Sequence, residues 1–181
     1  MWRLLAIAGV LVPVIGCGAA PQDVRGGQQS AFASRTASNP WVIARARRCE
    51  EVLPLLQEAA GTHGIDSGLL VGIVEVESSF RPAAVSSAGA VGLMQVMPAN
   101  GRNLSCGDLS EPVSNIACGI RVLKGFLRYY DGDLIFALSG YNAGFARPNR
   151  ARREGRLPSN HGYVEKVLAA RASYLRRGCG T

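Results

Sequence analysis

Apolar residues recur every three or four positions along most of the chain from residue 41 onward. This spacing matches the turn of a helix, whereas a strand places apolar residues at every second position. The pattern predicts helices at 41–60, 66–80, 91–98, 112–130, 133–141 and 162–177. No alternating stretch is long enough to predict a substantial sheet. We therefore expect an all-α, mainly helical fold.

Polar residues and prolines sharpen some of these boundaries. Asp66 can cap the second predicted helix, and Pro112 falls where a first-turn proline is tolerated. Pro54 lies inside the first predicted helix and is expected to kink or divide it. The segment 147–156 contains five arginines and is expected to be a solvent-exposed loop.

The first forty residues differ from the rest. One early arginine precedes an apolar run too short for a spanning helix, which is typical of a secretory signal. The sequence "VIGC" resembles the bacterial lipobox, so Cys17 is predicted to be acylated and to anchor the mature chain. The alternative is ordinary cleavage near Ala19 or Ala20, which discards Cys17. The expected organisation is a lipoprotein signal peptide at 1–16, a lipidated cysteine and flexible tether at 17–40, and one domain at 41–181.

Four further cysteines, an even number, suit an exported chain because disulfides persist in oxidising compartments. Three pairings are possible. We favour Cys106 with Cys118, which closes a short loop, and Cys49 with Cys179, which ties the start of the domain to its end. The chain has no CxxC motif, and its two histidines lie in no known ligand spacing. We therefore expect neither a metal nor a cofactor.

Eighteen arginines and two lysines give the chain a formal net charge of +7. Such a charge is compatible with nucleic-acid binding. An exported protein, however, meets anionic envelope polymers and lipid headgroups. We expect no nucleic-acid partner, and a periplasm-facing lipoprotein held to a membrane through Cys17, the outer membrane being favoured over the inner.

The stretch "GIVEVESSFRP" at 72–82 carries two glutamates. In helical phase, Glu77 shares an apolar stripe with Leu70, Ile73, Val74 and Phe80. Glu75 projects to the far side, where we expect a surface charge. Burial raises the pKa of a carboxyl group, as a general acid requires. A structural role for Glu77, accepting bonds from an arginine or from backbone donors, remains equally open on periodicity alone.

Further motifs follow in order: "ESSF" at 77–80, Ser86, "GLMQ" at 92–95, "MP" at 97–98, "NIACG" at 115–119, "YNAG" at 141–144 and "YVEKV" at 163–167. Together they resemble the catalytic domain of the family 1 soluble lytic transglycosylases, lysozyme-like enzymes that cleave peptidoglycan. The resemblance covers about 48–175. It implies a single domain of the lysozyme-like α+β superfamily with little or no sheet.

The resemblance also implies roles for individual residues. Glu77 would be the only catalytic acid and base. The substrate-binding positions would be Ser86 and Gln95 at the saccharide, Met97 along the groove, Tyr141 beside Glu77 to position it, and Asn142, whose role the motif does not specify. The family commonly has an acidic residue and a threonine where this chain has Ser159 and Asn160, so no contact is carried over to those two positions.

The implied reaction cleaves the β-1,4 bond between N-acetylmuramic acid and N-acetylglucosamine and leaves a 1,6-anhydromuramyl end. Because the substrate supplies the nucleophile, one carboxylate suffices, whereas most glycosidases use two. Two alternatives stay open: a muramidase resembling goose-type lysozyme, which adds water, and a non-catalytic, lipid-anchored glycan-binding module. Small members of the family often serve secretion or pilus machinery, but the sequence identifies no such partner.

Overall fold

The computed structural model describes residues 39–180 and contains seven helices in that range. They are α2 (Pro40–His63), α3 (Ser67–Ser78), α4 (Pro98–Asn103), α5 (Pro112–Tyr129), α6 (Leu134–Ala143), α7 (Ala146–Arg153) and α8 (His161–Arg177). In this part of the chain, strand-like pairing is limited to two isolated bridges, from Val91 to Val85 and to Val96. The expected all-α fold is confirmed.

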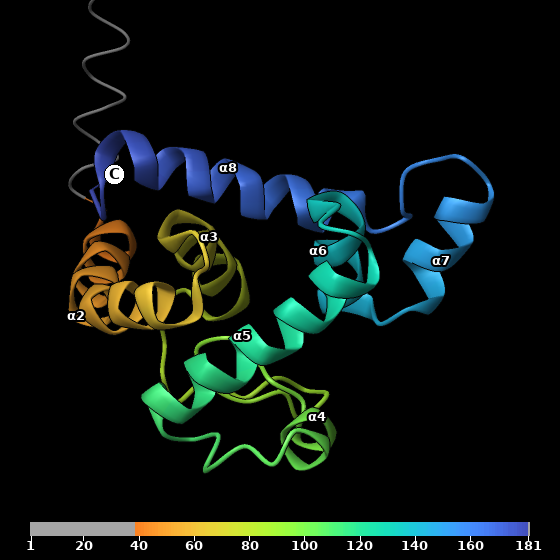
Figure 1. Ribbon diagram of the computed structural model, residues 1–181. Coiled ribbons are helices and arrows are strands. Elements are labelled where there is room, and N and C mark those ends of the chain that lie inside the picture. The colour runs from red at the N-terminus through yellow and green to blue at the C-terminus, as the bar shows by residue number, and fades with distance from the viewer. Residues whose placement is uncertain (1–38, 181) are drawn as a thin grey trace, which may run out of the picture.

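Helix α3 lies at the centre of the fold and packs most extensively along α8, with α2 on another side (Figure 1). Its residues from Gly68 to Val74 are all buried. At Gly72 the two helices come very close, because a Cβ atom there would lie 2.6 Å from the carbonyl oxygen of Val167. This packing fixes the backbone that carries Glu77.

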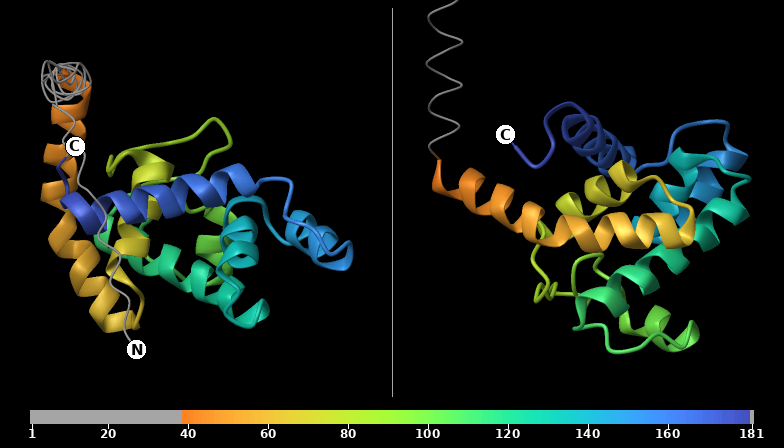
Figure 2. Two further views of the ribbon diagram at one scale, coloured as in Figure 1. Left: turned by 90° about the horizontal axis from the view of Figure 1, so that it is seen from above. Right: turned by 60° about the vertical axis from the view of Figure 1, so that its left-hand side comes forward.

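The predicted caps are present. Asp66 accepts a 2.7 Å hydrogen bond from the backbone N–H of Leu69 and caps α3. Pro112 occupies the start of α5. Helix α2 continues through Pro54 as one helix and bends along its length (Figure 2), so this proline does not divide it.

Both favoured disulfides are confirmed. Cys49 in α2 bonds to Cys179, just beyond α8, across 130 positions of sequence. Cys106 bonds to Cys118 in α5 across 12 positions. The first bond joins the two ends of the described domain, and the second ties the loop after α4 to α5.

The prediction of a helix at 91–98 is wrong. Gly92 and Gln95 have positive φ angles of 79° and 45°, which a continuous right-handed helix excludes. The buried side chain of Asn115 replaces the helical bonds, because it accepts from the Met94 N–H at 2.9 Å and donates to the Val91 carbonyl at 2.8 Å. The segment is a loop pinned from α5, and the next helix, α4, starts only at Pro98.

The expectation of a loop at 147–156 is also wrong, since most of the segment belongs to α7. Pro148 and Ala151 form the buried face of this helix. The Tyr130 hydroxyl donates a 2.8 Å hydrogen bond to Oδ1 of Asn149. The expectation of solvent exposure holds for all five arginines of the segment.

The predicted signal peptide, Cys17 and all but the end of the tether lie outside the described residues. Within residues 39–180, no helix has both the length and the apolar character needed to cross a membrane.

Candidate active site

An open cleft of about 240 Å³ lies where α3 ends, between the 84–97 loop, α5 and α6. Its lining includes every saccharide-site residue predicted from the sequence: Glu77, Ser86, Gln95, Met97, Tyr141 and Asn142. Ala88, Ala90, Val96, Asn100 and Val122 complete it. The fold therefore gathers residues from five of the listed motifs at one place.

Glu77 is half-buried in this cleft, one position before the end of α3. Burial raises the pKa of its carboxyl group, and a hydrogen bond from Tyr163 partly opposes that rise. Among the residues that line the cleft, Glu77 is the only one with a carboxylate. No group of three or more His, Cys, Asp or Glu side chains in residues 39–180 could hold a metal ion.

Two tyrosines flank Glu77, and the one that bonds it is not the one expected. The Tyr163 hydroxyl, on α8, donates to Oε1 of Glu77 at 2.6 Å. Tyr141 lines the cleft, but its hydroxyl donates to the carbonyl of Met94 at 2.7 Å. Burial, reinforced by the Glu77 charge, raises the pKa of both tyrosines far above the usual range. Both therefore stay protonated, and the positioning bond comes from Tyr163.

The 84–97 loop presents two polar groups of opposite hydrogen-bonding character. The side-chain amide nitrogen of Gln95 donates both of its hydrogens, one to the carbonyl of Ala84 at 3.1 Å and one to the carbonyl of Gly92 at 2.9 Å. Its Oε1 is left to accept. Ser86 Oγ already accepts from the Ala90 N–H at 3.0 Å, which leaves the hydroxyl hydrogen to donate.

Asn142 faces the cleft from the end of α6, with its amide held in one orientation. Asn160 Nδ2 donates to the backbone carbonyl of Ser139 at 3.1 Å and to Asn142 Oδ1 at 2.9 Å. A carbonyl only accepts, so this contact fixes which atom of Asn160 is the nitrogen. The Ser139 hydroxyl completes the network by donating to Asn160 Oδ1 at 2.6 Å. Asn142 therefore keeps its Nδ2 donors for a ligand.

The cleft continues into a second groove of about 710 Å³ between α4, α5 and α6. Five residues line both: Met97, Asn100, Val122, Tyr141 and Asn142. Gly144 and Phe145 belong to the lining of the groove. Its lining contains two arginines, Arg121 and Arg128, and no acidic residue.

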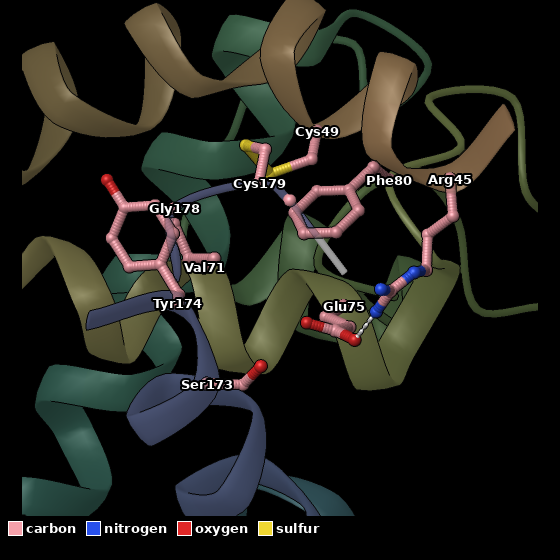
Figure 3. Close-up of a pocket in the computed structure, with 10 residues that line it drawn as sticks. Arg45, Cys49, Val71, Glu75, Phe80, Ser173, Tyr174, Gly178 and Cys179 are labelled. Carbon is pink, nitrogen blue, oxygen red and sulfur yellow. Dashed lines mark hydrogen bonds and ion pairs between the residues drawn. A yellow bond between two sulfur atoms is a disulfide. The ribbon is translucent and has the colours of Figure 1, made fainter. Parts of the chain in front are cut away.

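Glu75 is not the free surface charge that helical phase predicts. Figure 3 shows its carboxylate facing the guanidinium of Arg45, beside the disulfide of Cys49 and Cys179. The two side chains of this ion pair are only 23% and 31% exposed, respectively. The arginine arrives from α2, 30 positions earlier, so the helical phase of α3 alone gives no sign of it. Glu75 stabilises the α2–α3 contact and lies outside the cleft.

Several contributors to the site were missed from the sequence. The motif that contains Tyr163 implies no role for it, and the resemblance carries no contact over to Asn160, yet both side chains hold residues of the cleft in place. Asn100 and Val122 line the cleft without any motif. A tyrosine just before the buried Val164 and Val167 of a helix was the available signal for Tyr163.

The fold and this cleft can be compared with known proteins. The model of the Transglycosylase SLT domain family matches residues 54–161, more than half of the 181-residue chain. The chain belongs to this family.

Known relatives share this domain within longer chains. The membrane-bound lytic murein transglycosylase C of Histophilus somni (strain 2336) is 42% identical over 118 residues, covering 55% of this chain and 32% of the relative. The transglycosylase of Enterobacteria phage PRD1 is 37% identical over 110 residues, covering 61% of this chain and 40% of the relative. This chain therefore spans about a third of the length of the first relative.

A solved structure has the same fold. It is an inactive mutant of the lytic transglycosylase Slt from Pseudomonas aeruginosa, with one glutamate replaced by glutamine. The TM-score is 0.61 and the sequence identity 26%, over 68% of this chain and 24% of the other. The helical lysozyme-like architecture is thus shared with an enzyme much larger than this chain.

Proposed function

We propose that the protein is a peptidoglycan lytic transglycosylase in which Glu77 acts first as acid and then as base. The observation that carries this proposal is the isolation of Glu77, the one carboxylate lining the cleft, with a raised pKa and a bond from Tyr163. A two-carboxylate hydrolase needs a second acidic group about 5–10 Å away. Here the substrate supplies the missing group.

The proposed reaction has two steps. Protonated Glu77 donates its proton to the oxygen between N-acetylmuramic acid and N-acetylglucosamine, and the bond from that oxygen to the muramyl anomeric carbon breaks. The 2-acetamido oxygen stabilises the positive anomeric carbon. Ionised Glu77 then takes the proton of the muramyl C6 hydroxyl as that oxygen bonds the anomeric carbon. Glu77 ends protonated, and the product carries a 1,6-anhydro ring. A carboxyl with a raised pKa suits both steps.

The other cleft residues fit a saccharide. The Ser86 hydroxyl and the Asn142 Nδ2 group can donate to sugar or acetamido oxygens, and Gln95 Oε1 can accept from an N–H or O–H. Met97 is 39% exposed and offers an apolar surface to a sugar face. Tyr163 holds one Glu77 oxygen and so directs the other toward the bond to be cleaved.

The relatives support the same activity. The Histophilus somni relative is named a membrane-bound lytic murein transglycosylase, and the phage PRD1 relative is named a transglycosylase. The inactive P. aeruginosa mutant indicates that loss of one glutamate stops a related enzyme. The direct test is Glu77→Gln, which keeps the side-chain volume and removes the transferable proton. We expect no soluble product from purified peptidoglycan and an unchanged fold. Release of soluble product by this variant at the wild-type rate would refute the assignment of Glu77 as the catalytic acid and base.

We also propose export and lipid attachment at Cys17, with the signal peptide at 1–16, the tether at 17–40 and the domain from 41. The lipobox-like "VIGC", the two disulfides and the words "membrane-bound" in the relative's name support this. The expected location is the periplasmic side of the outer membrane. The test is metabolic labelling with a fatty acid, and Cys17→Ser should abolish both the label and membrane retention.

A further inference from the structure

Helix α7 carries an exposed arginine surface that the proposed reaction does not use. Arg147, Arg150 and Arg153 are exposed, and within residues 39–180 none of them has a hydrogen-bond acceptor or an acidic partner. We call these the α7 arginines. Their neighbours differ, because Arg152 pairs with Asp131 at 3.2 Å and Arg156 pairs with Glu154.

The helix that presents these arginines is fixed to the domain. The Phe145 ring, just before α7, lies 4.7 Å from the rings of both Phe126 and Tyr129, measured between centroids. The Tyr130–Asn149 hydrogen bond and the Arg152–Asp131 pair hold the helix at further points. A ligand of the α7 arginines therefore meets a preorganised helix and not a mobile loop.

The position of α7 connects it with the substrate path. The lining of the groove that continues the cleft includes Gly144 and Phe145, and α7 starts at the next residue. Arg128 already lines the groove, which has no acidic residue. A strand bound at Glu77 that follows this groove past Phe145 would come to the start of α7, and the only charged side chains in the groove lining are arginines.

We infer that the α7 arginines, together with Arg128, bind carboxylates on the peptide stems of the glycan strand. This inference rests on the proposed function. Guanidinium groups pair with carboxylates in a planar, two-point geometry. In intact peptidoglycan the lactyl carboxyl group is consumed in the amide bond to the peptide, so the negative charges of the strand lie on the stems. The enzyme thus favours strands that still carry peptides.

The test compares two substrates and two matched variants of the full chain. Arg150→Gln/Arg153→Gln removes two charges from α7, and Arg176→Gln/Arg177→Gln removes two from the end of α8, at the opposite end of the molecule (Figures 1 and 2). The substrates are peptide-bearing strands and strands stripped by an amidase. We expect the α7 variant to lose about fivefold in kcat/KM on peptide-bearing strands, as two exposed ion pairs allow.

On stripped strands, kcat/KM of the same variant should stay within about twofold of the wild-type value. On peptide-bearing strands, added salt should reduce the difference in kcat/KM between the variant and wild type, because salt screens exposed charges. The α8 variant should match wild type on both. An equal loss on both substrates, a larger loss on stripped strands, or no loss on either would overturn the inference. So would unchanged strand cleavage with lost binding to phosphatidylglycerol vesicles, because α7 would then be a lipid contact. Failure of the proposed function looks different: wild type would yield no anhydro product from either substrate.

Discussion

The hydroxyl of Tyr163 donates a 2.6 Å hydrogen bond to Oε1 of Glu77, joining α8 to the end of α3 across 86 positions of sequence. A bond to the charged form lowers a carboxyl pKa, whereas burial raises it. At Glu77 burial is the larger influence, so the pKa stays above its usual value. Tyr163 thus limits how far burial raises the pKa of Glu77.

Removing this hydroxyl should move the pH dependence of the reaction. In Tyr163→Phe the pKa of Glu77 rises further, so the carboxyl stays protonated to higher pH. We expect the alkaline limb of the kcat/KM profile to shift to higher pH. Tyr174→Phe, on the same helix but outside the cleft, is the control and should leave the limb in place. A downward shift in Tyr163→Phe would contradict this role.

Glu77 should also lower the free energy of unfolding of the protein at neutral pH. Its pKa is raised in the folded state above the ordinary value of 4.5, so the favourable contribution of the protonated group is complete below that value. The contribution is lost as pH rises through the folded-state pKa. Glu77→Gln should therefore be more stable than wild type at pH 7, because the amide removes the cost of ionising a buried carboxyl.

Urea denaturation of both proteins at pH 7 and pH 4 measures this effect. The advantage of the glutamine variant should shrink toward pH 4, where wild-type Glu77 is mostly protonated in both the folded and the unfolded state. A pH-independent difference would mean that burial does not perturb this carboxyl.

The amide network beside the cleft predicts coupling between Asn142 and Asn160. Asn160→Ala frees the Asn142 amide to rotate, so we expect KM to rise about fivefold with little change in kcat. Asn142→Ala should have a similar effect, and the double variant should be no worse than either single one. Ser159→Ala, at the exposed neighbour, serves as the control. Additive effects would show that Asn160 does not act through Asn142.

Close packing of α3 on α8 predicts opposite results at two helical glycines. At Gly72 an added Cβ meets the Val167 carbonyl at 2.6 Å, so Gly72→Ala should lower the free energy of unfolding by about 2 kcal/mol. Gly61, in α2, has nothing within 4 Å of its added Cβ. Gly61→Ala should stabilise the protein by about 0.5 kcal/mol through helix propensity. Equal midpoints for the two variants in urea would contradict the close approach.

Local sequence signals predicted most of the fold because they act within a few residues. The apolar spacing located α3, α5, α6 and α8, and Asp66 capped α3 as expected. The same reasoning failed at 91–98, where the apolar run resembles a helix. The side chain of Asn115, some 21 positions beyond Met94, takes the backbone bonds that a helix would need. In α7 the apolar signal was too small, since only Pro148 and Ala151 are buried.

The candidate site shows the same division. The six substrate-site and catalytic positions implied by the motifs all line the cleft. The motifs do not predict which of these side chains form hydrogen bonds with one another. Helical phase places Glu75 at the surface because it contains no sign of the partner, Arg45, which lies on another helix. The resemblance implies that Tyr141 positions Glu77, whereas the hydrogen bond to Glu77 comes from Tyr163 on α8 and Tyr141 bonds the Met94 carbonyl. Contacts between distant segments depend on tertiary packing, which helical phase does not describe.

The mass of the new glycan end tests the central claim most directly. Purified sacculi are digested with the wild-type protein, and the released muropeptides are analysed by mass spectrometry, with Glu77→Gln as the blank. Ends that are one water lighter than a reducing N-acetylmuramic acid are the predicted result, because the C6 hydroxyl closes the ring. Reducing muramic ends from the wild type, absent with Glu77→Gln, would contradict the claim and indicate hydrolysis by the same carboxyl.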